Sequence, residues 1–221
     1  MSATTATKER PILFSGPMIR AILEGQKTQT RRIVKRQRDM EFDVNDPTYG
    51  PYWLSYATEA DGEDAKVRCP YGKPTDRLWV RETHRYWFPD WIDPPAYPCR
   101  CRYKADDSLV ELAVEREENL QFSTPEDVGL DVESTKWRPS IFMPRWASRI
   151  LLAITAIRVE RLQNISGPDC WAEGIAYAGW DPERYGSLLE CYRDLWESTY
   201  GRGSWAANPW VWVVEFSRAQ P

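Results

Sequence analysis

The chain has 221 residues, long enough for one sizeable domain with insertions, and its formal net charge at pH 7 is -4. This charge argues against a protein that coats DNA generally, so any nucleic-acid contact must be local. A single histidine and five cysteines without C-x-x-C spacing argue against a histidine-based catalytic centre and a zinc module, and we predict no metal and no other cofactor.

The start of the chain shows no export or membrane signal. Residues 1–10 lack the apolar core of a signal peptide, and no segment has the apolar length of a membrane span. We therefore expect a cytoplasmic protein with a flexible start over residues 1–10 and no membrane partner. The sequence leaves monomer and dimer open.

A short helix and a polar run follow. Residues 11–14 predict a strand, and residues 18–23 place their apolar side chains on one helix face. Gly25 is a natural helix stop, and it opens the run Gly25-Gln26-Lys27-Thr28-Gln29-Thr30-Arg31-Arg32. A lysine and a hydroxyl three residues apart can form a base and its nucleophile. The same hydroxyls and arginines can instead hold an anion, and the residues alone leave both interpretations open.

The middle of the chain alternates in charge. Segment 31–38 is basic, which indicates either a solvated surface or a rim that attracts polyanions. Residues 39–73 have no sustained period and predict an irregular insertion, whereas the alternation over 76–82 predicts a strand. The prolines of 88–98 exclude a helix there. The acidic stretch 104–136 predicts a second excursion that includes one strand.

The last third reads as regular structure. A long strand is predicted over 148–162, and Ser166 opens a short helix that Gly174 closes. A second helix is predicted over 182–198, followed by a strand over 209–216 whose apolar residues on both faces indicate a central position. The elements predict an α+β domain dominated by strands, for which the simplest closure is a small β-barrel with helices packed outside.

A catalytic interpretation of the polar run needs a third residue. Lysine takes a proton from a hydroxyl only when desolvation or nearby positive charge lowers its pKa, and Arg31 and Arg32 lie next to Thr30 in the chain. A carboxylate from elsewhere would orient Lys27 or return a proton to a leaving amine, and Glu173 is our candidate. The ordinary alternative is a capped helix end with a solvated lysine.

The order of these motifs resembles a known family. The helix and the run 25–32, then Asp76-Arg77-Leu78-Trp79-Val80-Arg81-Glu82, then Ala172-Glu173-Gly174, then the strand after Asn208-Pro209, resemble the ASCH domain, which is PUA-like. Segments 137–141 and 143–149 look like those of the longer ASCH proteins encoded by bacteriophages and prophages. The resemblance spans the chain apart from the first ten residues and parts of the insertions.

This resemblance implies a fold and a reaction. It implies one PUA-like β-barrel domain over residues 11–221, with insertions near 39–75 and 85–136 and a cleft suited to RNA or a modified nucleoside. The small bacterial enzymes to which the chain is similar are amidohydrolases that remove the acetyl group from N4-acetylcytidine with a lysine, a threonine and a glutamate. Their motif assigns these catalytic roles to Lys27, Thr30 and Glu173.

The same match suggests residues that bind the substrate. Thr28 and Arg32 are expected to line the pocket, and Arg31 and Arg81 are further candidates, although a strand-end ion pair is the alternative for Arg81. The chain departs from the family in its long insertions, which either cover the cleft, admit a larger substrate or block the reaction. It also has Thr75 where relatives commonly have glycine.

Two other functions stay open at this point. One is a non-catalytic module that binds RNA or a modified nucleic acid, with the basic segment on phosphates and an aromatic side chain stacked on a base. The other is a ribonuclease. The location expected for all three is the cytoplasm of a bacterial host.

Overall fold

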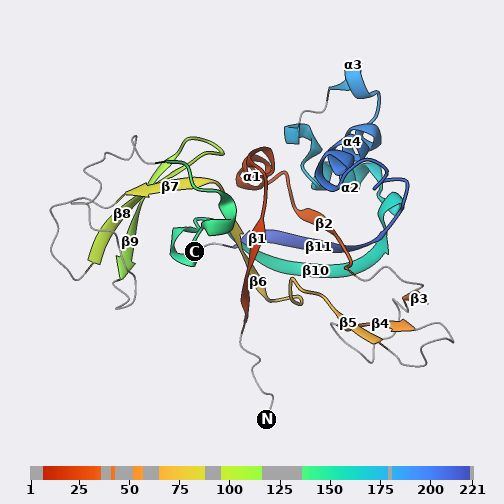
Figure 1. Ribbon diagram of the computed structural model, residues 1–221, viewed down its shortest axis with the longest axis horizontal. Coiled ribbons are helices and arrows are strands. Elements are labelled where there is room, and N and C mark those ends of the chain that lie inside the picture. Colours follow the sequence, from red (N-terminus) through yellow and green to blue (C-terminus); the bar gives the residue numbers. More distant parts are fainter. Residues whose placement is uncertain are drawn as a thin grey trace, which may run out of the picture. The chain divides into compact units, whose positions relative to one another are not determined.

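The computed structural model describes residues 7–35, 41–42, 52–56, 65–87, 96–115, 136–178 and 181–219 (Figure 1). The chain divides into two compact units. Unit 1 comprises Met1–Arg10, Ala21–Leu78 and Leu151–Pro221, and unit 2 comprises Pro11–Arg20 and Trp79–Ile150. The single domain expected over residues 11–221 stays a prediction.

The largest sheet has five strands in the order β1-β6-β10-β11-β2. Their bounds are β1 Glu9–Leu13, β2 Gln29–Ile33, β6 Arg77–Arg81, β10 Leu151–Arg161 and β11 Trp210–Ala219. The strands expected near residues 11–14, 76–82, 148–162 and 209–216 are thus confirmed, whereas β2 was not anticipated. Because β1 and β2 are the end strands, the described sheet is open. The α+β class is confirmed, and the closed barrel stays a prediction.

Strand β11 is central, as its sequence indicates. It pairs antiparallel with β10 on one side and with β2 on the other (Figure 1). Residues 211–214 are all buried, so both faces of the strand are covered. A strand covered on both faces needs apolar side chains at successive positions, which is the pattern of Val211-Trp212-Val213-Val214.

Two of the helices pack against one face of this sheet within unit 1. Helix α1 spans Gly16–Leu23, α2 Gly167–Ala172, α3 Pro182–Tyr185 and α4 Leu188–Tyr200. Side chains of α2, α4 and β11 form one core. This core contains Cys170, Tyr192, Trp196, Val211 and Val213. Among the described helices, none has the length and apolar character needed to cross a membrane.

The single helix expected over 182–198 is wrong, because two helices lie there. Gly186 has a φ of +63° and separates α3 from α4. Ser187 then caps α4, since its hydroxyl accepts a hydrogen bond from the Glu190 amide. The apolar stripe identified the helical period but not this interruption, which depends on the backbone freedom of glycine.

Two small antiparallel sheets account for other strands. The first joins β3 (Glu41–Phe42), β4 (Tyr52–Tyr56) and β5 (Ala65–Arg68), so the irregular structure expected over 39–73 is wrong for these segments. The second joins β7 (His84–Trp87), β8 (Ala96–Tyr103) and β9 (Leu109–Glu115). Strand β9 confirms the one strand expected in the acidic stretch. The other strands of these two sheets show no sustained period that would predict them.

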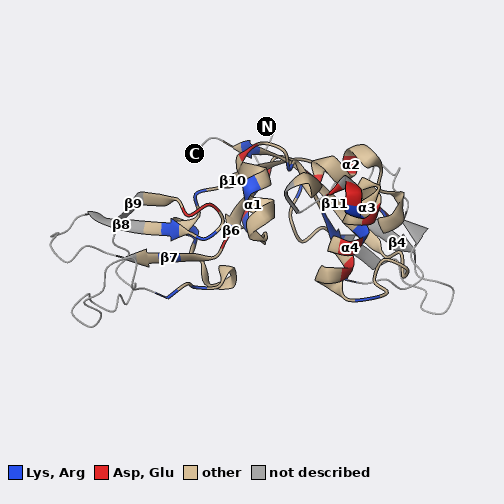
Figure 2. Ribbon diagram, turned by 90° about the horizontal axis from the view of Figure 1, so that it is seen from above, with Lys and Arg blue, Asp and Glu red and all other residues tan. Residues whose placement is uncertain are grey.

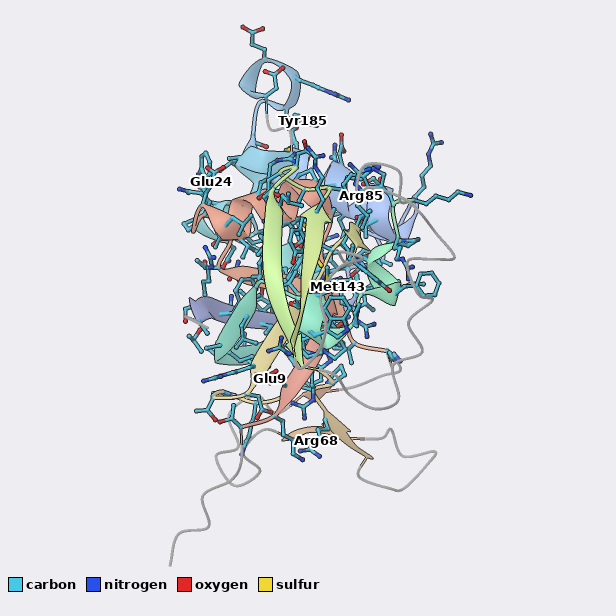
Figure 3. All side chains as sticks on the ribbon, turned by 90° about the vertical axis from the view of Figure 1, so that its left-hand side faces the viewer. Glu9, Glu24, Arg68, Arg85, Met143 and Tyr185 are labelled. Carbon is cyan, nitrogen blue, oxygen red and sulfur yellow. The ribbon has the colours of Figure 1, made fainter. Side chains whose placement is uncertain are left out.

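Unit 2 has a core of its own, formed by Cys101, Tyr103, Met143 and Ala147. Figure 3 labels Met143 of this core. Beside Tyr103 lies Arg149, whose guanidinium carbon is 4.1 Å from the centre of the tyrosine ring. Arg149 also donates from Nε to Glu82 Oε1 at 2.8 Å and from a terminal nitrogen to Glu82 Oε2 at 2.9 Å. One arginine fork therefore holds both oxygens of this fully buried glutamate.

The turn before β6 contains the threonine that departs from the family pattern. Thr75 has a φ of +81°, in the left-handed region that glycine adopts without steric cost. Its amide donates to the Ile154 carbonyl oxygen at 3.0 Å, which ties the turn to β10. Thr75 thus holds a conformation that favours glycine, and a hydrogen bond to the sheet helps to maintain it.

Candidate functional site

The site starts from Lys27, which the end of α1 holds in place. Gly25 has a φ of +73° and turns the chain back, so that the amides of Gln26 and Lys27 both donate to the Ala21 carbonyl oxygen, at 2.8 and 3.0 Å. The next amide, that of Thr28, donates to Ala172 at 2.9 Å and so attaches the turn to the end of α2. The helix stop read from the sequence therefore also positions Lys27.

Helix α2 presents Glu173 to this turn. Ser166 and Asp169 form a capping box at the start of the helix, as the sequence suggests, and Glu173 is the C-cap residue. Gly174 follows with a φ of +81°, and a Cβ atom at this position would lie 2.9 Å from Ala21 Cβ and 3.1 Å from Lys27 Cβ. The glycine after Glu173 therefore allows α2 to approach Lys27 closely.

Lys27 and Glu173 form a buried ion pair. Lys27 Nζ lies 2.9 Å from Glu173 Oε2, 2.7 Å from the Glu173 carbonyl oxygen and 2.8 Å from that of Gln29. The exposed fractions of the two side chains are 0% and 4%. Burial lowers the pKa of Lys27, Glu173 opposes this change, and the positive charges of Arg32 and Arg31 add to it. The structure thus brings together two of the three residues predicted to be catalytic.

Arg31 enters the same cluster from β2. Its side chain has no exposed surface, and one terminal nitrogen donates to Glu173 Oε1 at 3.2 Å. Its Nε and its other terminal nitrogen donate to Glu160 Oε1 at 3.1 and 2.5 Å, and Asp169 Oδ2 lies 3.3 Å from the latter nitrogen. The predicted substrate-binding residue Arg31 is therefore occupied by three carboxylates. Figure 2 shows acidic and basic segments next to each other around α2, α4 and β11.

Gln29 is a further member that the sequence argument did not select. It is buried, and its side-chain nitrogen donates to the carbonyl oxygen and to a carboxylate oxygen of Asp169, both at 3.0 Å. Although burial opposes the change, hydrogen bonds from Ser166 and Gln29 and the charge of Arg31 lower the pKa of Asp169 to about 2. Gln29 thus links β2 to the first turn of α2.

Thr30 is buried but faces away from this cluster. In the register of β2 and β11, Arg31 pairs with Val213, which packs against α2 and α4, whereas Thr30 pairs with Val214. Successive strand residues point to opposite faces, so Thr30 and Arg32 lie on the other face of β2. Among the described residues, no hydrogen bond joins the Thr30 hydroxyl to the Lys27 ammonium. The predicted nucleophile and base are neighbours in the chain without being in contact.

Two other predicted residues make contacts of their own. Thr28 is exposed, and its carbonyl oxygen accepts a hydrogen bond from the Phe216 amide at 2.8 Å. Arg81 belongs to unit 2, where it lies over the Trp79 ring at 4.6 Å and donates to the Ile141 carbonyl oxygen at 3.2 Å. Of the basic segment 31–38, residues 36–38 lie outside the described part of the chain.

Glu160 is another residue that the sequence argument missed. It lies on β10, which was predicted as a long strand, and it accepts hydrogen bonds from both Arg31 and Arg158. The signal was available, because Arg158 and Glu160 are two residues apart and so lie on one face of that strand. The contact of Glu160 with Arg31 depends on the pairing of β10 with β11 and of β11 with β2, because this pairing brings Arg31 to the same face.

The structure also bears on metal binding. Within the residues described, no group of three or more His, Cys, Asp or Glu side chains is arranged to hold a metal ion. The described cysteines Cys69, Cys101, Cys170 and Cys191 are buried free thiols.

Comparisons with known proteins give no relative. No family model, no curated protein and no solved structure matches the chain. Any functional inference therefore has to come from the residues themselves and from the resemblance of their motifs.

Proposed function

We propose that this protein is an ASCH-type amidohydrolase that removes the acyl group from N4-acetylcytidine or a related modified nucleobase without a metal. The observation that carries the proposal is the buried Lys27–Glu173 pair, in which Oε2 and Nζ are 2.9 Å apart. A lysine whose pKa is lowered by burial can act as a base, and an adjoining carboxylate can accept and return its proton.

The chemistry begins with proton transfer within the pair. Lys27 passes a proton to Glu173 Oε2, which leaves a neutral amine as the base and a carboxyl group that holds the proton for the later step. Lys27 then takes the proton of Thr30, whose oxygen attacks the acyl carbon. The carbon–nitrogen bond breaks, Glu173 protonates the departing exocyclic amine, and water later hydrolyses the acyl-threonine. This mechanism requires Thr30 to turn toward Lys27 in the substrate complex, because its side chain lies on the other face of β2 in the structure.

The finer fold and location belong to the same proposal. The five-stranded sheet with α2 and α4 on one face is the part that we assign to a PUA-like barrel, and the two small sheets fall in the predicted insertions. A nucleoside or RNA substrate places the protein in the cytoplasm of a bacterial host, encoded by a phage or prophage.

The test uses the full chain and two substrates. Free N4-acetylcytidine and acetylated RNA are incubated with the protein, and loss of the acetylcytosine absorbance is followed. We expect turnover that Lys27→Ala and Thr30→Ala each reduce by at least about a hundred-fold. Lys104→Ala, which changes an exposed lysine of unit 2, is the matched control and should retain full activity.

Other outcomes distinguish the alternatives. Full activity of either the Lys27 or the Thr30 variant contradicts the mechanism. Absence of product from both substrates, combined with RNA binding that weakens steeply with salt, supports the non-catalytic binding module instead. Shortening of the RNA supports a ribonuclease.

A further inference from the structure

The carboxylate of Glu173 is divided between two cations. Oε2 accepts from Lys27 at 2.9 Å, whereas Oε1 accepts from Arg31 at 3.2 Å. The two cations differ chemically, because an arginine keeps its charge at every accessible pH and a lysine can lose its proton when it is buried. Any change in how strongly Arg31 holds Oε1 alters how strongly Oε2 holds Lys27.

Arg31 is itself fixed from two directions. Glu160 on β10 and Asp169 on α2 bind the part of its guanidinium that does not face Glu173. Glu160 is held in turn by Arg158, whose Nε lies 3.1 Å from Glu160 Oε2. The Arg31 side chain has no exposed surface, and each of its three guanidinium nitrogens lies within 3.3 Å of a carboxylate oxygen.

This arrangement weakens the hold of Glu173 on Lys27. A carboxylate that is shared with a permanent cation attracts a second cation less than an undivided one does, and the Arg31 charge also repels the Lys27 ammonium. Among the described residues, the charged and titratable groups that act on Lys27 include Glu173 at the end of α2 and Arg31 and Arg32 from β2. Tyr192 from α4 interacts in turn with Glu173 and Arg31. Of these groups, Arg31 alone bonds to the same carboxylate as Lys27.

We propose that Arg31 is a positioning residue, which holds Glu173 and acts through it on Lys27 and does not contact the substrate. This inference rests on the proposed function for its effect on turnover, but its effect on Lys27 stands independently. It replaces the substrate-binding role expected for Arg31 from the sequence.

The first experiment does not depend on activity. The side-chain nitrogen signal of Lys27 is followed against pH in protein labelled with 15N-lysine, and it is assigned by its absence in Lys27→Arg. We expect Arg31→Gln to move the titration midpoint of Lys27 upward, because Glu173 then serves Lys27 alone. Arg31→Lys, which keeps the charge but lacks the fork, should lie between Arg31→Gln and the unchanged protein.

Arg161→Gln is the matched control. Arg161 is exposed in unit 1, lies over the Trp210 ring at 4.3 Å and donates to the Asn208 carbonyl oxygen. Its removal should leave the Lys27 midpoint unchanged. If Arg31→Gln does not fold, Glu160→Gln tests the same link in the opposite direction. It releases the Arg31 guanidinium to bind Glu173 more closely, so the Lys27 midpoint should move downward.

The second experiment measures turnover against pH. A base acts only when deprotonated, so a higher Lys27 midpoint should lower kcat of Arg31→Gln by about ten- to a hundred-fold at neutral pH and restore it at higher pH, with KM changed by less than about two-fold. A purely structural role of Arg31 would lower kcat equally at every pH. A rise of KM without a shift of the pH profile would mean that Arg31 binds the substrate, and would overturn the inference.

The two failures are distinguishable. An unchanged Lys27 midpoint in Arg31→Gln overturns the positioning role even if the unchanged protein is active. Lack of turnover by the unchanged protein overturns the proposed function, while the titration of Lys27 still decides the role of Arg31.

Discussion

Two buried glutamates in this protein have different partners. Glu82 in unit 2 gives both carboxylate oxygens to Arg149, whereas Glu173 in unit 1 gives one oxygen to Arg31 and the other to Lys27. Both side chains are almost fully buried. The difference lies in whether a partner can lose its proton within an accessible pH range.

In the Glu82 cluster, which comprises Glu82, Arg149 and Asp106, the cation is an arginine that both carboxylates hold. Burial raises the pKa of Glu82, which Arg149 opposes. Although burial also opposes the change, hydrogen bonds to Glu82 and Asp106 raise the pKa of Arg149, so the cation of this pair keeps its proton. The Glu173 cluster, which comprises Lys27, Arg31 and Glu173, contains a lysine whose pKa is lowered by burial. A buried ion pair therefore indicates chemistry when its cation can lose a proton, as a lysine can. Stability alone explains a pair whose cation is an arginine.

The largest expected loss of stability is that of Glu82→Gln. The substitution leaves the Arg149 guanidinium, of which 12% is exposed, without its main partner, and arginine cannot escape the cost by losing its proton. We expect a loss of about 3–5 kcal/mol in the free energy of unfolding at pH 7. Urea unfolding of the full chain measures this loss. A value below about 1 kcal/mol would mean that Arg149 does not depend on Glu82 as its main partner.

Gly174→Ala should separate Lys27 from Glu173 without changing a charge. The new Cβ would lie within 3.1 Å of both Ala21 and Lys27 at a φ of +81°, so backbone strain and overlap together should cost about 2–4 kcal/mol. Gly25→Ala is the matched control, because its φ is +73° but its added Cβ meets nothing within 4 Å. Thermal unfolding compares the two variants, and equal losses would mean that the close approach of α2 does not matter.

Glu173→Gln should cost less than Glu82→Gln, about 2–3 kcal/mol at pH 7, because Lys27 can lose its proton. Without this carboxylate, burial, Arg32 and Arg31 all lower the pKa of Lys27. The unfolded chain then binds more protons than the folded protein between that lowered pKa and the ordinary lysine value of 10.5, so stability rises with pH in this window.

Unfolding measured from pH 7 to 10 checks this difference between the clusters. The loss caused by Glu173→Gln should shrink as the pH rises, whereas that of Glu82→Gln should stay constant. Parallel curves for the two variants would show that Lys27 does not titrate in this range.

The smallest effects are expected at the outer carboxylates. Glu160→Gln and Asp106→Asn each weaken the anchor of an arginine, at side chains that are 18% and 28% exposed, and each should cost about 1 kcal/mol. Their stabilities should therefore match, but only Glu160→Gln should alter the pH profile of turnover, because only Glu160 holds the arginine that shares a carboxylate with a lysine. Equal activity of the two variants would remove this distinction.

Much of the local structure around the site was predictable. The Gly25 stop, the Ser166 cap and the Gly174 stop depend on interactions within a few residues, and all three are present as predicted. The partnership of Lys27 with Glu173 was proposed from motif resemblance, and the structure brings the two side chains together. The strands β2, β3, β4, β5, β7 and β8 were missed because their segments show no sustained hydrophobic period.

Sequence alone determined the helix stops at Gly25 and Gly174 and the central place of β11, because backbone freedom and apolar patterning are local properties. Only the tertiary structure decided that Arg31 lies on the helix-covered face with Glu173 while Thr30 lies on the other. A strand places successive residues on opposite faces, but which face receives which helix follows from the register of β2 on β11. The charges that act on Lys27 are thus set by packing, and packing separates neighbours in the sequence as readily as it joins residues 146 positions apart.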